Sequence, residues 1–158
     1  MSTRKTFTNQ DNIYIGISNN KNFGKTYFAK RNFKKGEVVY YIVGPVVRKP
    51  TDFTVPIGFG LFINPTEYGG RFTNDYKKPN LGILNRTRLV ALKNIRKDDE
   101  IGPGYFMFVP FYANGSTGKK LQLSSFNNIS SKTKAKYKKY ISDFLFRDKE
   151  IEKYRKFI

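Results

Sequence analysis

A chain of 158 residues, of which 39% are hydrophobic and 16% aromatic, is too apolar for intrinsic disorder and long enough to bury one core. It contains no Cys and no His, which excludes disulfides, thiolate metal sites and catalytic triads built on His. Its 30 Lys and Arg against 12 Asp and Glu give a net charge of +18, which favours polyanions such as nucleic acid or an acidic membrane as partners. A coding bias toward Lys, with solvated charge spread over the surface, explains the same charge without a partner. The first residues lack the apolar run of a signal peptide, and no apolar stretch is long enough for a membrane span, so we expect an intracellular protein.

The first residues of the chain are polar, and we expect residues 1–11 to be flexible. Beyond them, β-branched and aromatic residues recur in short runs bounded by Gly, Pro, Asn and Asp, which is the pattern of strands and turns. Strands are expected at residues 13–17, 26–29, 38–43, 46–47 and 59–63, with a hairpin formed by 82–84 and 88–92. Pro and Gly are frequent between residues 48 and 70, which argues against a long helix there.

Residues 113–158 differ in kind from the rest of the chain. After a connector at 113–131, apolar residues between positions 137 and 158 follow helical spacing along one continuous stripe, which predicts a basic amphipathic helix. Ser130 or Ser131 could cap its start. The first turns are rich in lysines that could contact phosphate or anionic lipid, or form a solvated face: Lys132, Lys134, Lys136, Lys138 and Lys139. Many short strands followed by one terminal helix predict a mainly β domain.

Three segments carry motifs. The first is Gly24-Lys25-Thr26-Tyr27-Phe28-Ala29, followed by Gly36-Glu37; the second is Arg71-Phe72-Thr73-Asn74-Asp75-Tyr76-Lys77-Lys78-Pro79-Asn80; the third is Asp99-Glu100-Ile101-Gly102-Pro103-Gly104-Tyr105. In order and spacing they resemble the SET domain, the fold of most protein lysine methyltransferases, over residues 12–112. The resemblance implies a mainly β, SET-like β-clip fold of several short sheets with a pseudoknot, in a divergent and compact form without zinc-binding modules.

The resemblance also implies S-adenosylmethionine (AdoMet) as methyl donor, and no metal. Tyr105 takes the place of the active-site tyrosine, unless it is a structural residue at the edge of the core. The positions that match the family's cofactor contacts are Gly24, Lys25, Thr26, Tyr27, Arg71, Asn74 and Asp75. The expected walls of a substrate lysine channel are Tyr68, Phe106 and Phe108. Packing in a β core is the more frequent explanation for such phenylalanines, and little separates Tyr68 from Tyr40 and Tyr41 as a channel tyrosine.

Three residues depart from the family pattern at functional positions. Thr26 replaces the second Gly of the first motif, Asp75 replaces a His, and Pro103 replaces an apolar residue before the tyrosine. Backbone contacts to a cofactor survive such changes, and a carboxylate is compatible with the positive sulfur of AdoMet. The leading interpretation is therefore an AdoMet-dependent protein lysine N-methyltransferase, nuclear or associated with chromatin or a virion, acting on a histone or another nucleoprotein.

Two alternatives remain open. The first is a catalytically inactive SET-fold protein that serves as a basic structural or nucleic-acid-binding component. The second is a basic, β-rich nucleic-acid-binding protein unrelated to the SET domain. AdoMet binding separates the leading interpretation from the first alternative, and the strand order separates it from the second.

Overall fold

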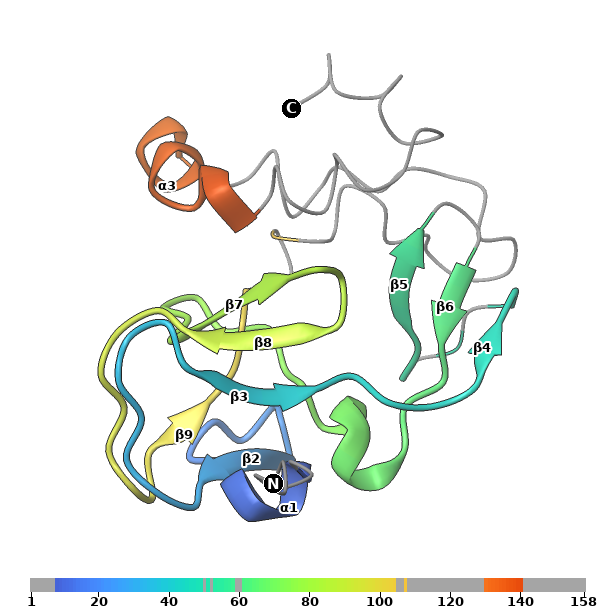
Figure 1. Cartoon of the computed structure of the whole chain (residues 1–158), viewed down its shortest axis with the longest axis horizontal. Helices are drawn as coiled ribbons and strands as arrows, with labels where there is room; N and C mark the ends of the chain where they lie inside the picture. Colours follow the sequence, from blue (N-terminus) through green and yellow to red (C-terminus); the bar gives the residue numbers. More distant parts are fainter. Residues whose placement is uncertain are drawn as a thin grey trace, which may run out of the picture.

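The structure is a computed structural model that describes residues 8–49, 51, 53–58, 61–104, 107 and 130–140 (Figure 1). Within these ranges the chain forms mainly short strands. Their bounds are β1 Ile13–Ile17, β2 Lys25–Ala29, β3 Val38–Tyr41, β4 Val46–Val47, β5 Val55–Gly58, β6 Leu61–Ile63, β7 Leu81–Leu84, β8 Arg88–Ala91 and β9 Glu100–Ile101. The helical elements are α1 Asn9–Asn12, the π-type turn η1 Glu67–Arg71 and α3 Ser131–Lys136.

The strands pair in three small antiparallel sheets with the orders β1-β2-β9, β3-β8-β7 and β4-β6-β5. In Figure 1, β4, β5 and β6 stand together at one side of the molecule, while β3 runs beside β8 and β7 across its middle. β9 pairs with β2 although the whole region from β3 to β8 lies between them in the sequence. This arrangement confirms the predicted mainly β fold of several short sheets.

The core lies between the sheets and contains two buried tyrosines as well as aliphatic residues. Tyr27 and Tyr40 are completely inaccessible to solvent, and their ring centroids lie 5.2 Å apart. A buried phenol needs a hydrogen-bond partner for its hydroxyl. Tyr40 finds one in the Thr73 hydroxyl at 2.8 Å, which links β3 to the second motif. The core therefore fixes the segment on which the resemblance places cofactor contacts.

The short helix α1 lies in the stretch that was expected to be flexible from its polar composition. Its Asn9 side chain donates to the backbone oxygens of Tyr41 at 2.8 Å and Tyr68 at 2.7 Å, and accepts from the Tyr41 amide at 2.9 Å. One polar side chain thus satisfies three backbone groups on β3 and η1. Polar composition alone does not reveal such bonds, because they depend on segments far away in the sequence.

The C-terminal helix α3 begins as expected after a serine cap. The Ser130 hydroxyl accepts from the Thr133 amide at 3.1 Å, which confirms the first of the two predicted caps. The predicted continuation of the helix after residue 140 lies outside the described residues. Among the described residues, no helix has the length and apolar character needed to cross a bilayer.

Candidate functional site

The three motif segments come together at one place in the fold. β2 carries the first motif and pairs with β9, which carries the third. The second motif lies against the end of β9, because the Tyr76 amide donates to the Pro103 oxygen at 2.9 Å and the Asn80 amide to the Gly102 oxygen at 3.2 Å. This close contact between a late segment and the 71–80 segment is what the expected pseudoknot requires.

Asn74 joins the first and second motifs directly. Its side-chain amide donates to the Lys25 backbone oxygen at 3.0 Å and to the Phe72 oxygen at 3.2 Å. The two acceptors belong to β2 and to the segment before Asn74, so one side chain fixes the spacing between them. Asn74 itself is half-buried, while Gly24, Lys25 and Asp75 beside it in the two motifs are exposed. These residues form an accessible surface that we call the Asn74 cluster: Gly24, Lys25, Asn74 and Asp75.

The side chain of Thr26 does not reach this accessible surface. Thr26 is completely buried, and its hydroxyl lies 2.6 Å from the Tyr76 hydroxyl. Tyr76 in turn donates to the Glu100 carboxylate at 2.8 Å, and that carboxylate also accepts from the Ser18 hydroxyl. The side chain of the residue that replaces the family's second Gly therefore faces inward.

The ring of Tyr76 is also closely packed. Its edge packs against Phe23, with ring centroids 5.0 Å apart. On the other side lies Gly102, where an added Cβ would come within 2.1 Å of the ring. Tyr76, Glu100 and Ser18 were not among the residues predicted for the site. No local pattern could have revealed them, because Tyr76 and Thr26 are 50 residues apart in the chain.

Tyr27 organises the backbone that leads into the second motif. Its hydroxyl donates to the Glu67 oxygen at 2.5 Å and accepts from the amides of Gly70 at 3.1 Å and Phe72 at 3.2 Å. Burial raises the pKa of Tyr27 to about 12, although the backbone amides that bond to its oxygen act in the opposite direction. At neutral pH Tyr27 is an uncharged structural residue whose side chain is not accessible to a ligand.

The charged residues predicted at the cofactor positions point to different places. The Lys25 ammonium lies 5.4 Å from the centroid of the Phe72 ring, at the Asn74 cluster. The Arg71 guanidinium lies 4.1 Å from the centroid of the Phe53 ring and thus extends toward the β4–β5 connection. The exposed cluster therefore carries one cationic and one anionic side chain, Lys25 and Asp75. Among the described residues, no group of three or more His, Cys, Asp or Glu could hold a metal ion.

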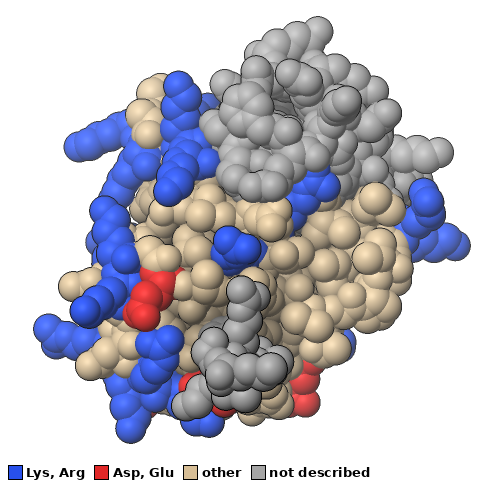
Figure 2. Space-filling model, in the orientation of Figure 1, with Lys and Arg blue, Asp and Glu red and all other residues tan. Residues whose placement is uncertain are grey.

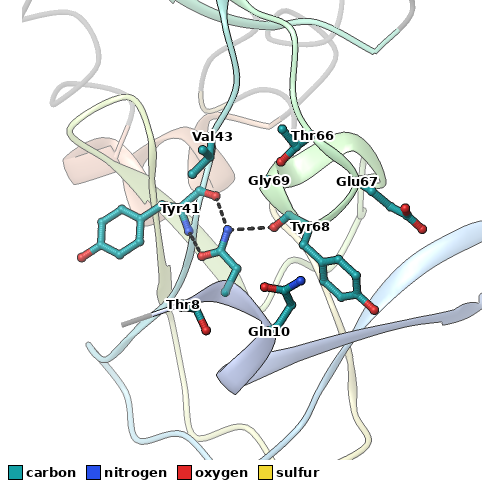
Figure 3. A pocket seen from close by; sticks show the side chains of 9 residues that line it. Thr8, Gln10, Tyr41, Val43, Thr66, Glu67, Tyr68 and Gly69 are labelled. Carbon is teal, nitrogen blue, oxygen red and sulfur yellow. Dashed lines mark hydrogen bonds between the residues drawn. The ribbon is translucent and has the colours of Figure 1, made fainter. Parts of the chain in front are cut away.

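Tyr68, predicted to line a lysine channel, is found beside a separate pocket. This pocket has a volume of about 450 Å³ and is bordered by α1, β3 and η1 (Figure 3). Its walls include Tyr41, Glu67 and Tyr68, and none of the residues of the Asn74 cluster. Asn9 also lines the pocket, and its side chain connects β3 and η1 through the bonds to Tyr41 and Tyr68 described above. The other predicted residues of catalysis and the channel, Tyr105, Phe106 and Phe108, lie outside the described residues.

Comparison with known proteins finds likeness in structure only. No protein-family model matches the sequence, and no curated protein matches it. A structure of Chaetomium thermophilum Polycomb Repressive Complex 2, in an autoinhibited conformation bound to S-adenosylmethionine, matches with a TM-score of 0.50 at 15% identity, over 60% of this chain and 15% of that chain. The fold is SET-like.

Two further solved structures are similar over a comparable share of the chain. A candidate histone methyltransferase from Plasmodium falciparum has 26% identity and a TM-score of 0.46, over 60% of this chain and 92% of that one. A humanized mutant of the Chaetomium thermophilum complex bound to the inhibitor GSK126 has 17% identity and a TM-score of 0.47, over 59% of this chain and 14% of that one. The SET-like chain thus spans about one seventh of the length of the polycomb chains.

Proposed function

We propose that this SET-like chain is a protein lysine N-methyltransferase that uses AdoMet. The observation that carries the proposal is the bond from Asn74 to the Lys25 backbone oxygen. It joins, within a SET-like fold, the two segments that the resemblance assigns to the cofactor. We further propose that the protein is intracellular, nuclear or associated with chromatin or a virion, and that its substrate is a lysine of a histone or another nucleoprotein.

The residues of the Asn74 cluster fit AdoMet chemically. Gly24 has a φ of +64° and no atom within 4 Å of where a Cβ would stand, so the backbone there is open to a ligand. Asp75 offers an anion to the sulfonium or ammonium group of AdoMet, and Lys25 offers a cation to its carboxylate. Thr26 is buried against Tyr76 and leaves this surface free.

In the proposed reaction, AdoMet supplies a methyl group on a positively charged sulfur. The Asn74 side chain keeps Lys25 and the second motif at a fixed spacing, so the cofactor surface is formed before binding. Tyr105 is proposed to orient the substrate amine, with Tyr68, Phe106 and Phe108 as proposed aromatic walls of its channel. An apolar wall disfavours the ammonium form of lysine, which must lose its proton before it can accept a methyl group.

Calorimetric titration with AdoMet and with its demethylated product tests this proposal. We expect binding to the unaltered protein and its loss in Asn74→Ala, because that variant frees the Lys25 carbonyl from its partner. Asn64→Ala, at an exposed asparagine outside the cluster, is the matched control and should bind normally. Tyr105→Phe should bind AdoMet but transfer no methyl group to nucleosomes. Absence of binding by the folded, unaltered protein would refute the proposal.

A second candidate is a SET-fold protein without methyl transfer that acts as a basic structural or nucleic-acid-binding component. The departures from the family pattern at Thr26, Asp75 and Pro103 favour it, because all three fall at positions that the resemblance assigns to the cofactor or to catalysis. This candidate predicts a folded protein that binds neither AdoMet nor its product. The same titration therefore decides between the two functions.

A further inference from the structure

A groove lined by lysines lies between α3 and the β core. Its volume is about 580 Å³. Four separate segments contribute five lysines to its walls: Lys35, Lys77, Lys78, Lys93 and Lys136. We call this set the lysine groove. No acidic residue is among the described residues that line it, and all five lysines are exposed. Figure 2 shows blue Lys and Arg side chains along the left of the molecule, with a few red acidic side chains among them.

The wall that α3 contributes is anchored by two tyrosines. Tyr137 is only 8% exposed and belongs to the hydrophobic core. Tyr140 lies over Gly82 in β7, so closely that an added Cβ there would come within 2.5 Å of its ring. Because both rings are packed, Lys136 of α3 is held at the groove that Lys77 and Lys78 also line. The lysines are therefore brought together by tertiary packing, as well as by their abundance in the sequence.

We propose that the lysine groove binds the phosphodiester backbone of a nucleic acid. Five ammonium groups around a concave surface match a chain of regularly spaced anions, and bringing them together without a counter-charge costs free energy that phosphate would recover. The half-buried ring of Tyr140 adds a surface on which a base can stack.

A membrane surface is a poorer match for this groove. Peripheral membrane binding combines basic residues with apolar side chains that enter the lipid. The large exposed hydrophobic residues of the described chain, Ile17, Val43, Val46 and Phe53, all lie outside the groove lining. A concave surface also places its lysines away from a flat bilayer, whereas a strand of nucleic acid can enter it.

The groove adjoins the proposed cofactor surface, because Lys77 and Lys78 follow Asn74 and Asp75 in the same motif. A bound strand would therefore lie beside the proposed methyltransferase site. The inference does not depend on methyl transfer, since it rests on the charge and shape of the groove alone. Its test is accordingly made without AdoMet, so failure of one proposal leaves the other to be judged separately.

The test is fluorescence anisotropy with labelled 20-nucleotide DNA and RNA, each single-stranded and double-stranded, at several salt concentrations. The groove variant carries Lys78→Ala and Lys136→Ala, and the control carries Lys21→Ala and Lys49→Ala at exposed positions outside the groove. Both variants lower the net charge from +18 by two. Loss of two phosphate contacts at about 0.15 M salt should weaken binding by about 15- to 30-fold and reduce the salt slope by about 1.4 to 1.8. The control should change less than about threefold.

Three results would overturn the inference. Equal losses in the groove and control variants would show that binding depends on total charge and not on the groove. Equal or tighter binding of polyglutamate, or of vesicles with phosphatidylserine, would identify a different partner. No binding of any nucleic acid at about 50 mM salt, with the protein folded by circular dichroism, would exclude the partner altogether. Preference for DNA or for RNA identifies the natural form of the ligand, and either one supports the inference.

Discussion

Replacement of Tyr27 by Phe should destabilise the protein strongly, although the ring that packs in the core stays the same. The substitution removes one oxygen that bonds to the Glu67 carbonyl and to the amides of Gly70 and Phe72. Gly70 is buried, so its amide cannot turn to water instead. A net hydrogen bond is worth about 1 kcal/mol, and a buried group left without a partner costs about 1–3 kcal/mol. We therefore expect Tyr27→Phe to lower the free energy of unfolding by about 3–4 kcal/mol at pH 7.

The same side chain predicts a specific dependence of stability on pH. The pKa of Tyr27 is about 12 in the folded protein, against the ordinary 10.0. Because burial favours the neutral phenol, the unfolded chain ionises first as the pH rises above 10, and stability is lost between pH 10 and pH 12. The Tyr27→Phe variant has no phenol at this position, so the ionisation of residue 27 does not reduce its stability between pH 10 and pH 12. The difference in unfolding free energy between the two proteins should therefore narrow by about 1.3 kcal/mol from about pH 9 to pH 11.

Urea unfolding at a series of pH values measures both effects. Tyr14→Phe is the matched control, because its hydroxyl bonds to Asp98 at the surface at 2.8 Å. We expect that control to change stability by about 0.5 kcal/mol or less at pH 7. A loss below about 1 kcal/mol for Tyr27→Phe, with no narrowing at alkaline pH, would refute the role of a buried, fully bonded hydroxyl.

Three further substitutions test other contacts. Asn9→Ala removes three bonds to the backbone and should lower the free energy of unfolding by about 2–3 kcal/mol in urea, whereas the exposed neighbour Gln10 should tolerate Ala. Gly102→Ala places a methyl 2.1 Å from the Tyr76 ring and should lower the free energy of unfolding by about 1–3 kcal/mol, and this penalty should be smaller when it is measured in a Tyr76→Ser background. Gly82→Ala should displace the Tyr140 ring. Amide hydrogen exchange should then become faster in residues 131–140, while exchange in β1 and β2 stays the same. Unchanged exchange in α3 would contradict this packing.

Most of the sheet structure could be predicted from the sequence, because alternation of apolar residues reflects burial on one face. β1, β2 and the β7–β8 hairpin lie close to where the pattern predicts them. β5 was not expected, because Pro56 removes a backbone donor from a strand. It is tolerated because β5 is an edge strand of the β4-β6-β5 sheet, where one side of the strand needs no ladder bonds.

The turn η1 could not be predicted from its own residues. Adjacent glycines at 69 and 70 argue against a helix, and the observed π-type turn includes Gly70 at a φ of 107°. The turn is instead stabilised from outside by the Tyr27 hydroxyl, which bonds to Glu67, Gly70 and Phe72. Propensity rules consider neighbours in sequence, and these bonds connect residues at least 40 positions apart.

Only part of the candidate site could be predicted, because motif spacing is visible in the sequence and long-range side-chain bonds are not. Motif spacing brought the first and second motifs to attention, and Asn74 does connect them. The bonds that link Thr26, Tyr76 and Glu100 could not be predicted, because these residues lie far apart in the chain. Pro103, which replaces an apolar residue of the family pattern, also lacks a backbone N–H to donate within a strand. β9 ends at Ile101, and the Pro103 oxygen accepts from the Tyr76 amide, so no ladder bond requires the N–H that proline lacks.

The contact between Thr26 and Tyr76 also limits how this chain could change over evolutionary time. A Gly at position 26 alone would remove a bonding partner of the Tyr76 hydroxyl and open space beside the β2 backbone. A Ser at position 76 alone would leave the Thr26 hydroxyl buried beside a void, because Thr26 is fully inaccessible. The two positions are thus expected to change as a pair, so relatives with Gly at the first should carry a small residue at the second. A joint change at positions 26 and 76 would then be one coordinated exchange that leaves neither buried hydroxyl without its partner, which is distinct from the gradual decay of an unused site.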